Sequence, residues 1–148
     1  MSLSNIGTRV YISLSKPATE DITGYAALTW TEIGGLSSWP ATGTKSETVS
    51  QPDLADGFNR KAHGAKDGGG GTAQCRVIEA DAGQQACETA ADTEADVSFK
   101  VVRKTGRIEY SYGIINGVTT NESSTNNVYG LSIDFGISSK TVKDDSGL

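Results

Sequence analysis

The chain has 148 residues and a mass of 15.4 kDa, with 36% hydrophobic and 21% charged residues, which suits one domain with a thin core. Its 13 basic and 18 acidic residues give a net charge of −5, which disfavours tight binding to the phosphates of DNA or RNA. No stretch approaches the roughly 18 apolar residues that span a bilayer, and the N-terminus lacks the basic and apolar regions of a secretory signal. We therefore expect no membrane contact and a reduced, cytosolic place of assembly.

Alternation of apolar and polar residues predicts the strands. It is clearest at residues 10–14, 97–101, 108–114 and 131–137, where every second residue is hydrophobic. Weaker patterns predict further strands at 28–33, 42–51 and 72–79. Short strands separated by turn residues are typical of a β-sandwich or barrel, here of about seven to eight strands. We expect residues 1–148 to form one such domain.

One helix is predicted at residues 82–91, flanking the sheet. Asp81 precedes it as an N-cap, and Gln84 stands three residues later, as in a capping box. Its apolar side consists mainly of alanines, together with Cys87. Such a small apolar face buries too little area to hold an isolated helix, so the helix must dock on the sheet.

Three segments have a different, polar character. Residues 51–71 combine both signs of charge and end in Gly68-Gly69-Gly70-Gly71, which predicts a long mobile loop with a flexible glycine hinge. Residues 116–127 predict a long exposed hairpin connection. The tail at residues 138–148 is polar, and we expect it to be frayed.

The residues that catalysis needs are sparse. His63 is the only histidine, lies between Ala62 and Gly64 in the polar segment, and is interpreted as a surface residue. No G-x-S-x-G elbow occurs, and the paired acidic residues stand in polar surroundings that favour solvated surface over general acid–base catalysis. Trp30 and Trp39 are interpreted as core or interface anchors. We predict that the chain is not an enzyme.

Cofactor and metal sites are not expected either. Cys75 and Cys87 lack the C-x-x-C spacing and the second histidine of a zinc site, and are interpreted as small buried hydrophobes. A disulfide between them remains an alternative, which a reducing compartment would oppose. The glycine run leads into a strand instead of a helix, so it lacks the helix N-terminus of a phosphate cradle.

The order of these features resembles a known family, the major tail (tail tube) proteins of long-tailed bacteriophages, especially those with non-contractile tails. The resemblance covers residues 8–141, and its most telling part is Gly83-Gln84-Gln85-Ala86 followed by the Phe-containing strand. The other segments that carry the resemblance are Val10 to Leu14, Trp30-Thr31-Glu32-Ile33-Gly34-Gly35-Leu36, Lys45-Ser46-Glu47-Thr48-Val49, Asp53-Leu54-Ala55-Asp56-Gly57-Phe58-Asn59-Arg60-Lys61, Gly64-Ala65-Lys66-Asp67-Gly68-Gly69, Val97-Ser98-Phe99-Lys100-Val101 and Tyr110-Ser111-Tyr112-Gly113-Ile114-Ile115.

The resemblance implies a virion protein that self-assembles into stacked, hexameric rings and so forms a hollow tube through which DNA passes without specific binding. It implies assembly in the host cytoplasm with tape-measure, tail-tip and tail-terminator proteins as partners. The segment at 51–71 would order on the adjacent ring, with contacts from Asp53, Leu54, Asp56, Phe58, Arg60, Lys61, Lys66 and Asp67.

An acidic lumen would repel the DNA backbone and let it slide. Glu109 and Asp134 alternate with apolar residues on their strands, so both are expected to point away from the core and are the candidate lumen charges. Two alternatives stay open: a small intracellular monomeric β-barrel that binds a ligand or partner, and a tube protein of a related injection system.

Overall fold

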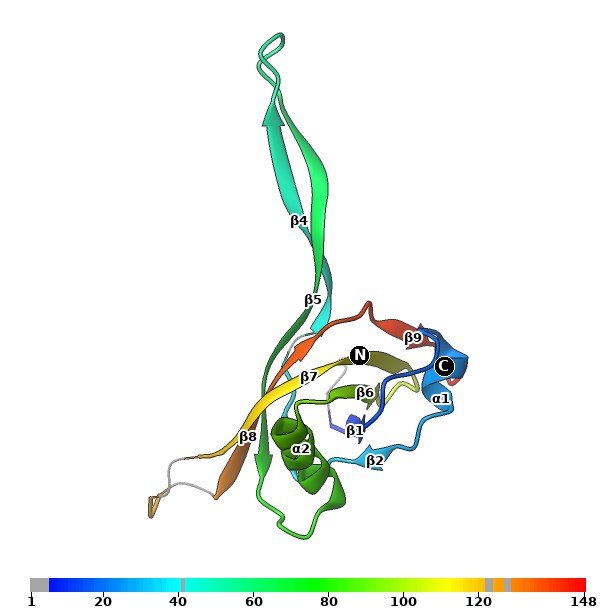
Figure 1. Ribbon diagram of the computed structural model, residues 1–148, viewed down its shortest axis with the longest axis vertical. Coiled ribbons are helices and arrows are strands. Elements are labelled where there is room, and N and C mark those ends of the chain that lie inside the picture. The colour runs from blue at the N-terminus through cyan, green and yellow to red at the C-terminus, as the bar shows by residue number, and fades with distance from the viewer. Residues whose placement is uncertain (1–5, 41, 122–123, 127–128) are drawn as a thin grey trace.

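The computed structural model describes residues 6–40, 42–121, 124–126 and 129–148, and shows a β-rich body from which one long hairpin projects (Figure 1). The strands are β1 (Arg9–Ser13), β2 (Thr31–Glu32), β3 (Leu36–Ser38), β4 (Thr42–Pro52), β5 (Asn59–Arg76), β6 (Asp96–Val102), β7 (Ile108–Thr120), β8 (Gly130–Ile137) and β9 (Val142–Asp144). The helices are α1 (Ile22–Ala26) and α2 (Ala82–Thr93). Part of the N-terminal stretch and part of the predicted 116–127 connection lie outside the described residues.

The main sheet is antiparallel and has the order β2-β1-β6-β7-β8-β5-β3, to which β5 adds β4 and β7 adds β9. Its two edge strands, β2 and β3, are separated in sequence only by residues 33–35. The sheet therefore curls until its edges approach each other, with Ile33 buried at the junction. The prediction of a mainly β fold with one flanking helix is confirmed. The described residues form nine strands in one sheet, and α1 is an additional helix.

The core lies on one face of this curled sheet, where the predicted alternation is confirmed. On β8, Leu131, Ile133, Phe135 and Ile137 are buried, and β6 contributes Val97, Phe99 and Val101. Three aromatic rings meet at its centre. Phe99 and Phe135 have ring centroids 5.1 Å apart, and Trp39 stacks on Phe135 at 4.6 Å. Trp39 is thus a core anchor, as one of its two interpretations expected.

The opposite face of the sheet carries a second, smaller aromatic cluster. Tyr110 of β7 stacks on Tyr25 of α1 at 5.2 Å, and Trp30 lies 5.9 Å from Tyr110. Helix α1 was not predicted from the sequence, where Glu20-Asp21 is one of the paired acidic residues interpreted as solvated surface. The Asp21 carboxylate caps the helix by accepting the Gly24 N–H at 2.7 Å, and this bond lowers the pKa of Asp21.

Helix α2 covers the core face, close to the predicted bounds. The Asp81 carboxylate accepts the Gln84 N–H at 3.0 Å, which confirms the predicted N-cap. Gly83 is required by packing, because a Cβ there would collide with the backbone of Glu32. Cys87 and Ala90 are fully buried against the sheet. Small side chains thus let the helix approach closely, as expected.

The Gln84 side chain does not complete a capping box. It is buried, and its amide links three backbone segments: Nε2 donates to the carbonyls of Gly34 and Arg76 at 2.8 Å each, and Oε1 accepts the Ile78 N–H at 3.0 Å. Asp81 adds a fourth link by accepting the Gly34 N–H at 3.0 Å. Together these bonds satisfy the backbone where the two sheet edges approach, and they hold α2 over that junction.

Cys75 and Cys87 are both free and buried, so the interpretation as small hydrophobes is confirmed. Burial, and secondarily the neighbouring Cys75, raises the pKa of Cys87 to about 12.

The thiolate fraction of Cys87 at pH 8 is therefore about a thousandfold below that of an ordinary thiol, and we expect negligible reaction of the folded chain with a disulfide reagent. Absorbance titration should detect both thiols only after guanidinium unfolding; rapid labelling of the folded chain would contradict this burial.

Because the Cys87 thiol ionises near pH 9 in the unfolded chain and near pH 12 in the folded chain, we also expect the free energy of unfolding to fall as pH rises above about 9.

Two predictions about polar segments are wrong. Residues 51–71 are not an irregular loop: β4 and β5 pair antiparallel from Thr42 opposite Gly69 to Pro52 opposite Asn59, and only residues 53–58 turn between them. The tail at 138–148 is not frayed throughout, because β9 pairs with β7 and the Ser139 hydroxyl accepts the Tyr112 N–H at 2.9 Å. In both places backbone pairing, which leaves little trace in side-chain hydrophobicity, determines the structure.

Candidate assembly surface

The hairpin of β4 and β5, here called the arm (residues 42–69), projects from the body along the longest axis of the molecule (Figure 1). From Gly69 outward to the tip, the two strands of the arm pair only with each other among the described residues, and nearly all their side chains are exposed. An arm of this many residues extends about 30 Å. It therefore presents two unpaired strand edges, which are templates for pairing with another chain.

The glycine run marks the base of the arm, where β5 changes partners. Gly69 is opposite Thr42 of β4, whereas Gly70 is opposite Gly136 of β8. Gly70 has φ +146°, and a Cβ there would lie 2.6 Å from the Phe135 carbonyl oxygen. The run was predicted to be a flexible hinge, but it is part of the ladder and packs against β8. Glycine is needed here for backbone conformation and close approach.

The tip of the arm is an ordered turn that exposes hydrophobic side chains. Arg60 bridges two carboxylates, at 2.6 Å to Asp56 and 3.6 Å to Asp53. Each carboxylate also accepts a backbone N–H of the turn, at 2.9 Å. Leu54 is fully exposed and Phe58 is 69% exposed. The charged residues thus fix the turn, and the two apolar side chains are left without contacts to bury them.

The remaining predicted contact residues lie along the arm. Lys61 is opposite Ser50, Lys66 is opposite Ser46, and Asp67 is opposite Lys45. Asp67 also accepts the Gly69 N–H at 3.0 Å and so shapes the base. The structure therefore places all eight predicted contact residues on one projecting element. His63 is exposed on β5, as its interpretation as a surface residue expected.

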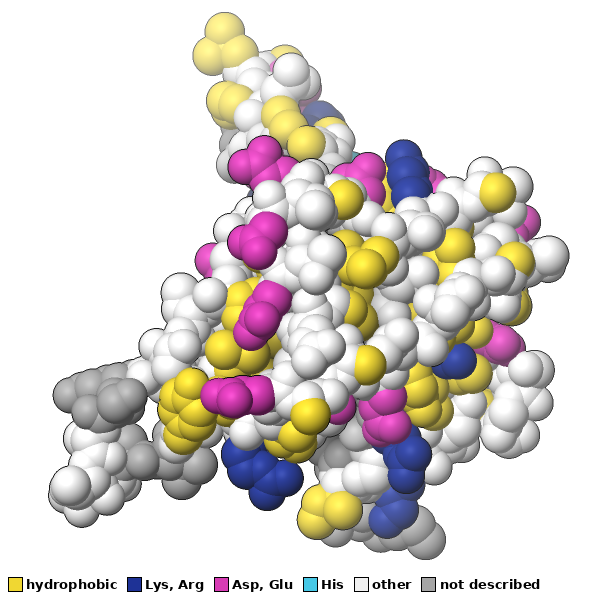
Figure 2. Space-filling view, turned by 60° about the horizontal axis from the view of Figure 1, so that its bottom comes forward, with side chains coloured by type: hydrophobic (Ala, Val, Ile, Leu, Met, Phe, Trp, Pro, Cys, Tyr) yellow, Lys and Arg dark blue, Asp and Glu magenta, His cyan; other side chains and the backbone are white. Residues whose placement is uncertain are grey.

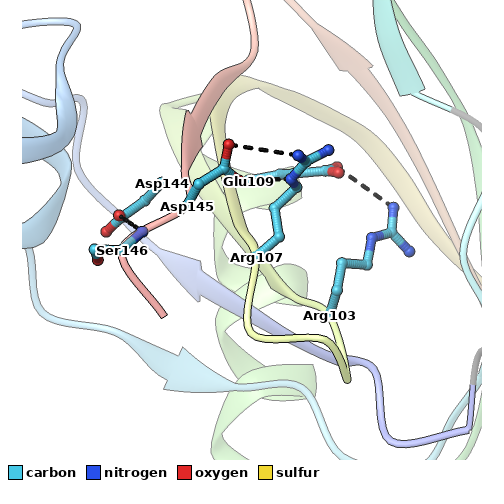
Figure 3. A network of polar contacts seen from close by, with 6 residues as sticks. All are labelled: Arg103, Arg107, Glu109, Asp144, Asp145 and Ser146. Carbon is cyan, nitrogen blue, oxygen red and sulfur yellow. Dashed lines mark hydrogen bonds and ion pairs between the residues drawn. The ribbon is translucent and has the colours of Figure 1, made fainter. Parts of the chain in front are cut away.

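Glu109 does not point away from the core, and this prediction is wrong. It is paired directly with Val101, a core residue of β6, so the two side chains share one face. Its carboxylate lies 3.4 Å from Arg103 (Figure 3). The alternation of residues 108–114 was correct in period but assigned to the wrong face, because Tyr110 belongs to the second aromatic cluster.

Asp134 is exposed on β8 between the buried Ile133 and Phe135, so it does point away from the core. It is paired with Gly117, whereas Glu109 is eight positions earlier on β7, about 26 Å along the strand. The two candidate lumen charges lie on opposite faces of the sheet. They therefore cannot line one surface of a single copy together.

A second ion pair near Glu109 attaches the chain's last residues. Arg107 lies 2.6 Å from Asp145, so the segment after β9 packs on the turn between β6 and β7 (Figure 3). Sequence reasoning missed this contact, because the partners are 38 residues apart.

Sequence reasoning also missed an acidic end of the molecule. Residues 76–96, here called the α2 end, run from the last residue of β5 through the following turn and α2 to the first residue of β6, and lie opposite the arm (Figure 1). They contain one basic residue, Arg76, against the acidic residues Glu79, Asp81, Glu88, Asp92, Glu94 and Asp96. Figure 2, which turns this end forward, shows a row of acidic side chains beside hydrophobic ones. A charge count over successive windows of the sequence would have found it.

The described residues contain no cluster of three or more metal-ligating side chains. Within the same part of the chain, no helix is long and apolar enough to cross a membrane.

Comparison with known proteins shows the fold. No family model matches the sequence, and no curated protein matches it. A chain of the SPP1 tail tube has a TM-score of 0.69 and 14% identity over 99% of this chain and 80% of its own length. A chain of the anti-feeding prophage baseplate has a TM-score of 0.66 and 10% identity, covering both chains fully. A chain of the GTA particle tail has a TM-score of 0.63 and 15% identity over 89% of this chain and 92% of its own. The chain therefore has the fold of tail tube proteins.

Proposed function

We propose that the chain is a virion structural protein that assembles into stacked rings and forms a hollow tail tube through which DNA passes during ejection. The observation that supports this proposal best is the arm. Among the described residues it is a two-stranded ribbon whose two outer edges pair with no other strand, and its tip exposes the apolar side chains of Leu54 and Phe58. An isolated two-stranded ribbon is only marginally stable in water, so the arm is best explained by a partner that pairs with it. A shared fold with chains of tail tubes supports that partner being another copy.

Six copies per ring are the favoured number, since the GTA tail was solved with C6 symmetry and the anti-feeding prophage baseplate was symmetrised sixfold. The net charge of −5 favours passage of DNA without specific binding. Asp134 keeps its role as a candidate lumen charge because it is exposed. Tape-measure, tail-tip and tail-terminator proteins are the further partners proposed, with assembly in the host cytoplasm.

A monomeric intracellular β-barrel that binds a ligand or partner is the alternative. The arm argues against this alternative, because its unpaired strand edges would promote aggregation of a monomeric protein and would serve no binding role in it. A tube protein of a related injection system is also compatible with the fold, since a chain from the sheath/tube terminator structure of an extracellular contractile injection system shares it with a TM-score of 0.66 and 9% identity.

Negative-stain electron microscopy of the purified chain at increasing concentration, with light scattering, tests the proposal. We expect stacked rings or hollow tubes, with scattering that rises steeply above a threshold concentration. Isolated tail tips, added as nuclei, should extend if spontaneous nucleation is slow. A chain that stays monomeric at every concentration and does not extend added tail tips would overturn the proposal in favour of the monomeric barrel.

A further inference from the structure

Asn116 is followed by Gly117, and this is the only Asn-Gly pair in the sequence. Asparagine is chemically labile, because the backbone nitrogen of the next residue can attack its side-chain amide carbon. Glycine favours this attack, because no side chain shields its nitrogen and its backbone reaches conformations that other residues avoid. The other five asparagines each precede a residue that carries a side chain. Asn116 is therefore the asparagine whose neighbour favours deamidation most.

Asn116 lies at a bulge in strand β7. Ile115 is opposite Phe135 of β8, and Gly117 is opposite Asp134, so no residue of β8 is opposite Asn116. A bulge leaves its extra residue unpaired and bends the strand. In a regular ladder, pairing on both sides of a residue keeps the backbone extended and holds the next nitrogen away from the side chain. At Asn116 the pairing that would impose this geometry is interrupted.

The surroundings of Asn116 leave its side chain free. The side chain is exposed, and no hydrogen bond holds its amide within the described residues. Asn121, directly after the same strand, shows the contrast, because its side chain is hydrogen-bonded to Gln74 and Ser132. A Cβ built at Gly117 would meet no atom within 4 Å. The Asn116 amide is thus free to turn toward the Gly117 nitrogen, and the pair is open to water.

We propose that Asn116 deamidates spontaneously in the folded chain. A base in the solvent removes the proton from the Gly117 nitrogen, which attacks Cγ of Asn116. The new C–N bond closes a succinimide ring, and the bond from Cγ to the side-chain nitrogen breaks, so that this nitrogen leaves as ammonia. Water then opens the ring at either carbonyl, which gives aspartate or isoaspartate. The net change is the uptake of water and the release of ammonia, and it needs no oxidant or reductant.

The product carboxylate adds charge to a hollow that is already acidic. Asn116 lines a depression of about 440 Å³ between α2 and β7, together with Glu88 and Asp92. Neither of these two carboxylates forms an ion pair within the described residues. The reaction therefore places a third negative charge in the hollow and takes the net charge of the chain from −5 to −6. This slow and irreversible change concerns the single folded copy, so it does not depend on the proposed function.

Mass spectrometry of the chain during storage tests the proposal. The purified folded chain is incubated at mildly alkaline pH, and samples are digested with pepsin in acid, which stops the reaction. Fragmentation locates the modified residue, and enzymatic methylation of the isoaspartyl carboxylate detects the second product. We expect conversion to begin at Asn116, to give both aspartate and isoaspartate there, and to become faster as pH rises.

Gly117→Ala is the matched control. Its added methyl group enters open space, so the fold should be retained, but it shields the attacking nitrogen. We expect this variant to react several-fold more slowly than the unmodified chain. Asn116→Gln keeps an exposed amide at the same position but needs a larger ring, so we expect no product there in the same time.

A synthetic peptide of residues 112–120 gives the rate of the same segment without the fold. If the folded chain shows no product at Asn116 when this peptide has reacted completely, the bulge holds the backbone out of reach and the proposal is overturned. Conversion that begins at Asn121 instead of Asn116 would overturn it as well. Reaction of Gly117→Ala at the rate of the unmodified chain would overturn the route through the Gly117 nitrogen.

Discussion

Replacing Phe99 by alanine is expected to lower the free energy of unfolding by about 3–5 kcal/mol. Phe99 is 1% exposed on β6, a strand in the interior of the sheet order, and its ring lies against both Phe135 and Trp39 at the centre of the core. Truncation leaves a cavity that the neighbouring large rings cannot fill without changing their rotamers. Urea unfolding of the dilute, unassembled chain, followed by tryptophan fluorescence, measures the loss.

The matched control is Phe58→Ala, the same change in side chain at the exposed tip of the arm. It should alter the stability of the single copy by no more than about 0.5 kcal/mol. A loss below about 1 kcal/mol for Phe99→Ala would show that the aromatic centre is not the main core of the domain. Measurement before assembly matters, because association would add its own stabilisation to both variants.

The fold was predictable where one face of a strand or helix is buried and the other is wet. Residues 131–137 show this best, since every second side chain is apolar and the structure buries those four. Helix α2 was predictable from its N-cap, because Asp81 precedes a run of alanines with helical spacing. In these segments side-chain chemistry and backbone geometry carry the same information.

The arm was not predictable by that reasoning. Both faces of β4 and of the outer half of β5 are exposed to solvent, so these strands show no alternation of apolar and polar residues from which they could be predicted. Gly64 and the run of four glycines also lower β-propensity, which favoured the interpretation as a loop. The eight residues proposed for contacts nevertheless lie on one element, because the resemblance to tail tube proteins delimited this segment without its secondary structure.

The two candidate lumen charges show a different limit. Alternation of apolar and polar residues identifies a strand, but it does not show which face of the strand packs on the core when both faces carry large apolar side chains. On β7, Tyr110 faces the cluster with Tyr25, while Ile115 faces the main core. Glu109 therefore lies beside Val101 instead of outside. On β8 only one face is apolar, and Asp134 was correctly placed.

Shortening the arm is expected to abolish assembly while the domain stays folded. Replacing residues 46–66 by Asn-Gly leaves Lys45 opposite Asp67, which is the geometry that a two-residue hairpin turn closes. The removed residues are nearly all exposed, and in the part of the chain that the structure describes β4 pairs only with β5, so the core loses no strand pairing. We expect thermal unfolding within a few degrees of the full chain, and no rings or tubes by electron microscopy.

The control for arm length keeps the ribbon and changes only its tip, with Leu54→Ser and Phe58→Ser in one chain. If the unpaired edges of the arm supply most of the binding energy, this variant assembles at a higher threshold concentration than the full chain. If the apolar tip supplies most of it, the tip variant is as inactive as the shortened one. Normal tubes from the shortened chain would contradict the role of the arm altogether, and ring contacts would then have to come from the edges of the body.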